Sequence, residues 1–186
     1  QQSYDYVIVG AGSAGCTLAN RLTENGKHSV LLLEAGPKDS SPWIHIPLGY
    51  AKTFANPKYN WCLNTETDPG MEGRSFYLPR GKTLGGSSSI NGLIYLRGQP
   101  QDYDLWEGLG NRGWGWRDVL PYFKRSERNV RGASDYHGAD GELGVSDVNH
   151  RHVLAKAFIE ACVQAGIRRN DDFNGAEQEG AGFLQF

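Results

Sequence analysis

Apolar and polar positions follow two different periods over the first 36 residues. The continuous apolar run YVIV at residues 6–9 predicts a strand buried on both faces of a parallel sheet. Apolar residues then recur at helical spacing, at Cys16, Leu18, Ala19 and Leu22. Gly26 is the expected end of that helix. The run SVLLLEAG predicts a second buried strand that ends at Glu34, so the segment as a whole predicts one β-α-β unit.

The turn between the first strand and the helix carries a dinucleotide-binding pattern. Gly10, Gly12 and Gly15 form G-x-G-x-x-G, and Glu34 follows 19 positions after Gly15. Such glycines let a pyrophosphate approach the backbone at a helix N-terminus, and the acid accepts hydrogen bonds from an adenosine ribose. A carboxylate there would repel a ribose 2′-phosphate. The pattern does not separate NAD from FAD, and a purely structural turn remains the alternative.

A second glycine-rich segment, RGKTLGGSSSINGLIYLRG, spans residues 80–98 and follows a long aromatic-rich excursion at residues 37–79. It offers bare backbone at Gly81, Gly85, Gly86 and Gly92, together with three serine hydroxyls and the amide of Asn91. Such a segment can lay N–H and O–H donors along a flat polar ligand with little steric bulk. A structural linker is the alternative, although it leaves the apolar run at residues 93–96 unexplained.

Composition and charge exclude several classes. The net charge of −2 over 186 residues leaves no basic stripe, so nucleic acid is not an expected partner. No apolar run reaches the roughly 18 residues of a membrane span. Cys16, Cys62 and Cys162 lack C-x-x-C spacing, which indicates neither a disulfide framework nor a zinc site. We expect a cytoplasmic protein and leave peripheral attachment to a membrane open. The sequence begins with Gln1 and has no cationic-apolar leader, so we expect any targeting segment to be absent or already removed.

The segments YDYVIVGAGSAGCTLANRL, LLLEAGP and RGKTLGGSSSINGLIYLRG with Asp104 resemble the glucose-methanol-choline (GMC) oxidoreductase family, in its bacterial alcohol and choline dehydrogenase branch. Later segments, including YHGADGELGVSD and NDDFNGAEQEGAGF, extend the resemblance over essentially the whole chain. The resemblance implies an α/β fold: a Rossmann-like FAD-binding domain with the beginning of a substrate-side domain. Residues 1–36 and 80–98 would form the FAD-binding core, 37–79 a lid, and 99–186 the start of the remaining FAD-side and substrate-side elements.

The same resemblance implies which residues hold FAD. The diphosphate would lie at Gly10, Gly12, Ser13, Ala14 and Gly15, and the adenosine ribose at Glu34 with Ala35 beside it. Arg80, Gly81, Gly85, Ser87, Asn91, Gly92, Leu93 and Ile94 would run along the diphosphate and the isoalloxazine ring. Trp61 lies in a segment that comes near the cofactor in the family, although a lone aromatic residue could equally belong to the core.

The implied reaction is oxidation of a primary alcohol to an aldehyde, with hydride passing to flavin N5 while a histidine removes the hydroxyl proton. The family's catalytic histidine belongs to a C-terminal motif that these residues lack, so we assign no catalytic residue and expect an N-terminal part that is inactive alone. Some relatives link FAD covalently through a histidine where Ile90 stands, so FAD should be non-covalent here. The alternatives are a non-redox or light-driven flavoenzyme, such as a lyase or photodecarboxylase, and a non-catalytic flavin-binding module with a companion chain.

The remaining histidines are not metal-ligand candidates. His150 and His152 stand two positions apart at the start of an expected helix and point to different faces. That helix should bury the stripe Val153, Leu154, Ala157, Phe158, Ala161 and Ala165. Contact with a substrate stays an alternative for His137, in a turn, and for His45, among apolar neighbours.

Overall fold

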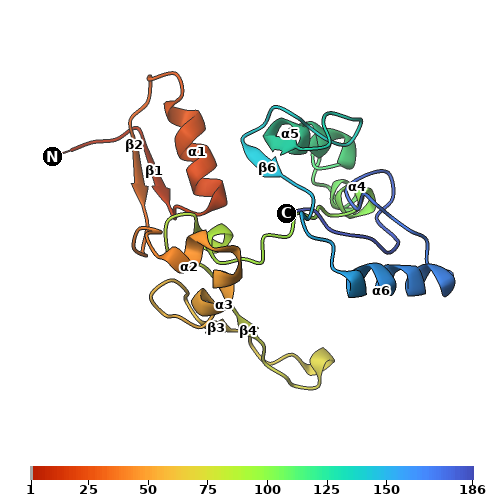
Figure 1. The fold of residues 1–186 in the computed structure, drawn as a ribbon. Coiled ribbons are helices and arrows are strands. Elements are labelled where there is room, and N and C mark those ends of the chain that lie inside the picture. Colours follow the sequence, from red (N-terminus) through yellow and green to blue (C-terminus); the bar gives the residue numbers. More distant parts are fainter. Residues whose placement is uncertain (1) are drawn as a thin grey trace. The chain divides into compact units, whose positions relative to one another are not determined.

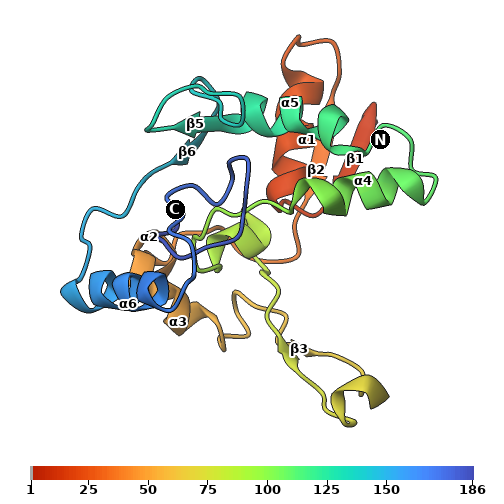
Figure 2. The same ribbon diagram turned by 90° about the vertical axis from the view of Figure 1, so that its right-hand side faces the viewer.

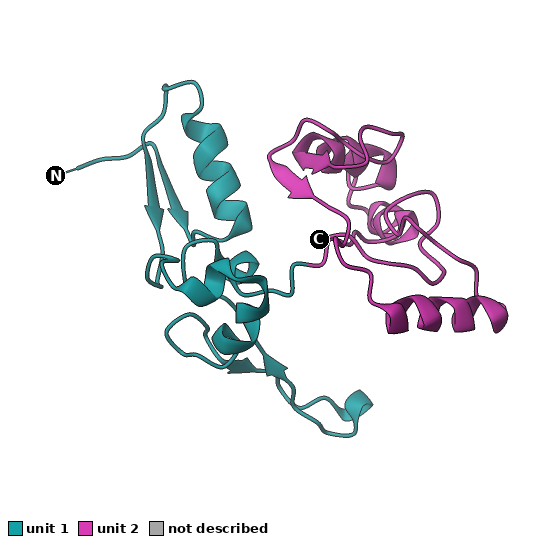
Figure 3. Cartoon of the chain, in the orientation of Figure 1, with its two compact units in different colours: residues 1–93 teal, residues 94–186 magenta. Residues whose placement is uncertain are grey.

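A computed structural model describes residues 2–186, and the chain divides into two compact units, residues 1–93 and residues 94–186 (Figure 3). The boundary falls inside the glycine-rich segment at residues 80–98. Each unit is described separately below.

The first unit begins with the predicted β-α-β arrangement. Strands β1 (Tyr6–Val9) and β2 (Val30–Leu33) pair in parallel, in a register that places Tyr6 opposite Val30, and helix α1 (Ser13–Thr23) connects them (Figure 1). The helix ends at Thr23, and Gly26, with φ +66°, donates its N–H to the Thr23 carbonyl over 2.9 Å. This β-α-β unit confirms the prediction from the sequence, with the glycine reversing the chain just beyond the helix.

The prediction that both strands are buried on both faces is wrong for the described chain. The side chains of Val7 and Val9 are 57% and 85% exposed, and Leu33 is 45% exposed. Within the described residues β1 and β2 pair only with each other, while α1 packs against the pair. A two-stranded sheet covered by one helix leaves apolar side chains in contact with solvent.

The rest of the first unit consists of short elements. They are α2 (Pro42–His45), η1 (Pro47–Gly49), α3 (Tyr50–Thr53), β3 (Leu63–Asn64), η2 (Pro69–Met71), β4 (Tyr77–Leu78) and η3 (Gly86–Ser89), where η denotes a 3-10 helix. Strands β3 and β4 pair antiparallel, and η2 lies at the tip of the hairpin that they form (Figure 2). After β4 an isolated bridge joins Gly81 to Asn60, and a second bridge joins Gly85 to Gly12 of the β-α-β unit.

The second unit contains three helices and one small sheet. Its elements are α4 (Pro100–Gly108), α5 (Trp116–Ser126), β5 (Glu127–Asn129), β6 (Leu143–Val145) and α6 (Val153–Gln164). Strands β5 and β6 pair in parallel, and α4 begins with a capping box between Gln99 and Asp102. Tyr103 of α4 meets α5 through ring contacts with Trp116 and Phe123. No helix in the described part of the chain is long and apolar enough to cross a membrane.

Helix α6 forms as predicted but buries a different face. Ile159 is 4% exposed, whereas Val153, Leu154 and Phe158 of the expected stripe are about 70% exposed. The face toward the unit runs instead through Ala155, Ile159 and Cys162. In a helix this rich in apolar residues several stripes satisfy the period, and packing selects among them. The predicted stripe is therefore wrong.

The best-buried side chain of the second unit is charged. Glu127 is fully buried; its carboxylate accepts from Arg97 Nη2 at 2.8 Å, from the Gly138 N–H at 2.9 Å and from Asn129 Nδ2 at 3.0 Å. His137 Nδ1 lies 2.9 Å from the same carboxylate. Burial raises the pKa of Glu127, but the hydrogen bonds from Asn129, His137 and Gly138 and the Arg97 charge outweigh it and hold the pKa below its usual value.

His137 is thus part of a buried network, although it lies in the predicted turn. Its Nε2 lies 3.0 Å from Asp172 Oδ2, and its Nδ1 faces Glu127. Asn129 also exchanges hydrogen bonds with Gln185 near the C-terminus, at 3.0 and 3.2 Å. These contacts join segments 35 to 56 positions apart, so the polar network organises the core of this unit.

We predict that Glu127→Gln lowers the stability of the protein by about 3 kcal/mol or more, because the Arg97 guanidinium stays buried without its counter-charge. The depressed pKa of Glu127 adds stability that is complete above the ordinary value near 4.5 and is lost as the pH falls through the folded-state pKa. Denaturant unfolding from pH 3 to 7 should therefore show a weaker acid dependence for Glu127→Gln than for the wild type. The exposed Glu179→Gln is the matched control, and equal losses in the two variants would contradict the assignment.

Candidate functional site

One pocket of the first unit collects three segments that are distant in the sequence. Its volume is about 530 Å³. It is lined by Val9, Gly10, Gly12, Leu33, Glu34, Ala35, Trp61, Gly81, Gly86 and Ser87. Three segments therefore meet around one pocket: the glycine turn after β1, the end of β2 and the returning glycine-rich segment. The sequence suggested a ligand-binding role for each glycine-rich segment independently.

The glycines of the first turn have three different structural roles. Gly10 adopts φ +98° directly after β1, a backbone conformation that favours glycine. Gly12 is the N-cap of α1 and makes no side-chain cap, so the first-turn N–H groups have no capping side chain. A Cβ on Gly15 would lie 1.9 Å from the Gly10 carbonyl oxygen, so only glycine lets the helix pack on the turn. The helix N-terminus beside the pocket is suited to an anionic group.

Glu34 directly follows β2, and its carboxylate is bonded to the glycine turn after β1. Its Oε2 accepts from the Ala11 N–H at 2.8 Å and its Oε1 from the Gly36 N–H at 2.9 Å. The sequence pointed to Glu34 as a ligand-binding acid but gave no sign of this structural role. Each carboxylate oxygen keeps a second acceptor position, and Glu34 lines the pocket, so it can still accept bonds from hydroxyl groups of a ligand.

The returning segment touches the glycine turn as backbone on backbone. Gly85, at φ +85°, donates its N–H to the Ala11 carbonyl over 2.8 Å. A Cβ on Gly86 would lie 2.8 Å from Gly12 Cα, and one on Gly81 would lie 2.1 Å from the Gly86 carbonyl oxygen. No side chain larger than hydrogen has room at these positions. The glycines of this segment therefore serve to let its backbone pack directly against the glycine turn.

The serines of this segment mostly bond to their own loop. Ser89 Oγ donates to the Leu84 carbonyl over 2.7 Å, and Ser88 Oγ donates to the Gly85 carbonyl over 2.5 Å. Ser87 Oγ accepts from the Gly81 N–H over 3.0 Å and also lines the pocket. Its hydroxyl hydrogen is left to donate outward.

Trp61 forms part of the pocket wall and is half exposed. The ammonium of Lys82 lies 5.0 Å from its ring centroid, within the range of a cation–π contact. The indole of Trp61 therefore gives the pocket a flat apolar surface, while Glu34 supplies polar acceptors to the same lining.

The other predicted site residues lie outside the lining of this pocket. Ser13 and Ala14 occupy the first turn of α1, with Ser13 and Arg80 both exposed. The exposed Asn91, Gly92 and Leu93 follow η3, and Ile94 is the first residue of the second unit. Ile90, just before them, is 2% exposed.

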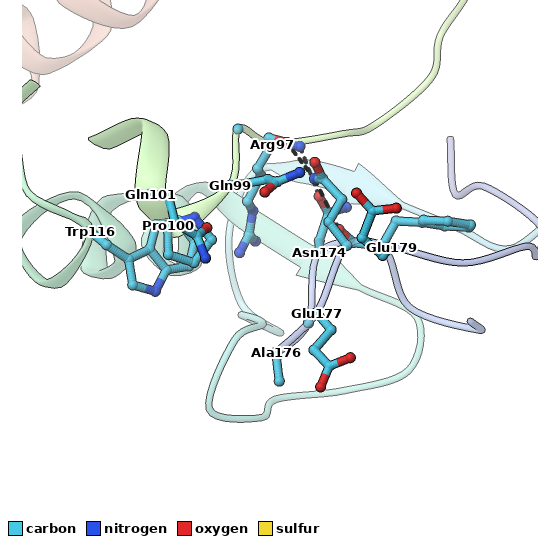
Figure 4. Close-up of a pocket in the computed structure, with 13 residues that line it drawn as sticks. Arg97, Gln99, Pro100, Gln101, Trp116, Asn174, Ala176, Glu177 and Glu179 are labelled. Atoms are coloured by element: carbon cyan, nitrogen blue, oxygen red, sulfur yellow. Dashed lines mark hydrogen bonds between the residues drawn. The ribbon is translucent and has the colours of Figure 1, made fainter. Parts of the chain in front are cut away.

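A smaller cavity of about 160 Å³ lies in the second unit, between the start of α4 and the loop at residues 173–179 (Figure 4). Two of its polar side chains bond to the backbone of Arg97: Asn174 Oδ1 accepts from the Arg97 N–H at 2.8 Å, and Gln178 Nε2 donates to the Arg97 carbonyl at 2.8 Å. The Arg97 guanidinium is bonded to Glu127 instead. We interpret this cavity as a structural feature of the loop.

The parallel β-α-β unit, the glycine turn at a helix N-terminus and the strand-end acid define a Rossmann-like dinucleotide-binding protein. A model of the GMC oxidoreductase family matches residues 4–186. The chain belongs to this family.

Individual relatives agree with this assignment. The chain is 52% identical to an alcohol dehydrogenase [acceptor] of Pseudomonas putida over 183 residues, which are 98% of this chain and 33% of that protein. It is 48% identical to human mitochondrial choline dehydrogenase, with 99% of this chain and 32% of that protein covered. Among solved structures, pyridoxine 4-oxidase from Mesorbium loti superposes with a TM-score of 0.90 at 37% identity, covering 98% of this chain and 36% of that one. The chain spans about a third of the length of these relatives.

We predict that Gly81→Ala destabilises the protein by about 1–3 kcal/mol, because the new Cβ would overlap the Gly86 carbonyl at the pocket wall. Gly108→Ala is the matched control, since a Cβ there meets open space at the end of α4. Urea unfolding of both variants and the wild type measures the difference. If the Gly81→Ala protein were as stable as the control, the backbone at Gly81 would not be in close contact with the Gly86 carbonyl.

Proposed function

We propose that this chain supplies the FAD-binding part of an oxidoreductase that oxidises a primary alcohol to an aldehyde. The observation that carries the proposal is the single pocket formed by the glycine turn, Glu34 and the segment at residues 81–87. The names of the two curated relatives, an alcohol dehydrogenase and a choline dehydrogenase, support an alcohol as the substrate class.

The residues of the pocket have the chemistry that FAD requires. Gly10 and Gly12 offer bare backbone at the N-terminus of α1 for the diphosphate, and Glu34 offers acceptors for the ribose hydroxyls. Gly81, Gly86 and Ser87 offer backbone and a hydroxyl along the opposite wall. When bound, FAD supplies the hydride acceptor at its N5 atom. Arg80 and residues 91–94 belong to the same proposal as further contacts, reached outside the lining of this pocket.

The base that removes the hydroxyl proton is proposed to come from polypeptide outside these 186 residues, either of the same protein or of a companion chain. Among the described residues that line the pocket, Glu34 is the titratable one, and both its oxygens accept backbone N–H groups. A positioned base contributes about 10²–10⁴-fold to such reactions. Residues 1–186 alone should therefore turn over no alcohol.

FAD is proposed to be held without a covalent bond. Ile90 has no nucleophilic atom and is buried. Ser89 Oγ donates to the Leu84 carbonyl, and Asn91 Oδ1 accepts from the Leu93 N–H, so neither neighbour is paired with a base.

The proposed function is tested on the purified protein that contains this chain. Acid precipitation should release its flavin into the supernatant, and primary alcohols, including choline and benzyl alcohol, should reduce an artificial dye acceptor. The matching carboxylates, which carry no carbinol hydrogen, are the controls. A pellet that remains fluorescent after washing would contradict non-covalent binding. A flavoprotein whose flavin no alcohol reduces would instead favour a non-redox or light-driven reaction.

We predict that Glu34→Gln weakens FAD binding about 10-fold or more, because an amide nitrogen replaces one of the oxygens that accept from Ala11 and Gly36 and that face the ribose. NADP should bind no better than in the wild type. Flavin titration of the apoprotein measures both. Glu66→Gln, an exposed position of the same unit, is the control, and unchanged affinity in Glu34→Gln would mean that the ribose is held elsewhere.

A further inference from the structure

Asn60 is a buried amide directly behind the pocket wall, and all four of its hydrogen-bonding positions are used. Asn60 is only 1% exposed. Nδ2 donates to the Phe54 carbonyl at 2.5 Å and to the Tyr77 hydroxyl at 3.1 Å. Oδ1 accepts from the Cys62 N–H at 3.0 Å and from the Arg80 N–H at 2.9 Å. A primary amide has two donors and two acceptor positions, so this side chain is saturated.

The oxygen of Asn60 joins the two chain segments that form one wall of the pocket. Cys62 and Arg80 are the neighbours of Trp61 and Gly81, which both line it. The same two segments are also bonded through the Trp61 N–H and the Arg80 carbonyl at 2.8 Å. The Lys82 N–H donates to the Tyr59 carbonyl at 2.8 Å as well, so the oxygen of Asn60 adds a side-chain link to two backbone bonds between the indole wall and the glycine wall.

This oxygen also supports an unfavourable backbone conformation. Cys62 has φ +53°, in the left-handed region that side chains other than glycine rarely adopt. Its N–H is bonded to Asn60 Oδ1, which offsets the cost of that conformation. Loss of the bond would leave this conformation, directly next to Trp61, without that compensation.

The nitrogen of Asn60 faces the other way, into the excursion at residues 37–79. Its partners, the Phe54 carbonyl and the Tyr77 hydroxyl, also bond to each other at 2.6 Å. Neither lines the pocket. The Tyr77 hydroxyl also interacts with the Cys62 side chain, but only Oδ1 accepts from the Cys62 and Arg80 N–H groups.

We propose that Asn60 is a positioning residue for the dinucleotide pocket: its side-chain oxygen holds Trp61 and Gly81 in the arrangement that the cofactor binds. The inference rests on the proposed function for its ligand, FAD. The pocket wall itself depends on Asn60 whether or not FAD is the ligand.

The first experiment measures the wall without any ligand. Hydrogen exchange of the apoprotein, followed by mass spectrometry, reports on the amides of residues 59–63 and 79–88. Asn60→Leu has a similar shape and removes both ends of the amide, so both segments should exchange faster than in the wild type. Unchanged protection in Asn60→Leu would overturn the proposal.

The second experiment measures FAD affinity by titration of the apoproteins. Asn60→Leu leaves the Cys62 and Arg80 N–H groups without their acceptor and should weaken binding about 10-fold or more. Tyr77→Phe removes a partner of the nitrogen end, together with the interaction of the Tyr77 hydroxyl with the Cys62 side chain, but keeps both acceptor bonds of Oδ1; it is the matched control, with a much smaller loss expected. Equal losses in Asn60→Leu and Tyr77→Phe would mean a general structural role and would contradict the proposal.

A double-mutant cycle separates positioning from simple loss of stability. If Asn60 acts through the indole, Asn60→Leu should cost much less affinity in a Trp61→Leu background than in the wild type. Additive effects would overturn the action through Trp61. A wild-type protein that binds no FAD would contradict the proposed function alone, because the exchange measurement still decides the role of Asn60.

Discussion

The pocket of the first unit depends on the direct backbone contact of two glycine-rich segments, one at Ala11 and Gly12 and the other at Gly85 and Gly86. The Gly85 N–H bonds to the Ala11 carbonyl, and Gly86 lies so close to Gly12 that a Cβ would collide. A hydrogen bond fixes the distance, and the absence of side chains permits it. The turn after β1 and the segment before η3 therefore form one continuous surface. Glu34 and Trp61 complete the lining around that surface.

Two polar side chains hold the loops around this contact, and they do so in the same way. Glu34 accepts from the backbone of Ala11 and Gly36, and Asn60 accepts from that of Cys62 and Arg80. Loops leave N–H groups without the partners that helices and sheets provide, and side-chain oxygens supply them. The difference is exposure: Glu34 also faces the pocket, so it can bind a ligand, whereas the buried Asn60 can only position other groups.

The second unit is also organised by polar contacts rather than by a large apolar core. Glu127 is fully buried with Arg97, His137 and Asn129 around it, while apolar side chains such as Phe158 of α6 remain exposed. A buried charge network of this kind requires defined partners at defined distances, because an unpaired charge in such a position is strongly unfavourable. It therefore specifies how β5, the turn at His137 and the C-terminal segment meet.

The sequence by itself determined the β-α-β unit, the glycine turn and the acid at the end of β2, because these signals lie within 36 neighbouring residues and follow local periods. It did not determine which faces are buried: the strands are more exposed than predicted, and α6 turns a different stripe inward. Nor could it find the roles of Asn60, Arg97 and His137. Each has a partner that lies 20 to 35 positions away, at Arg80, Glu127 and Asp172 respectively. No local pattern encodes such contacts, since tertiary packing alone brings these residues together.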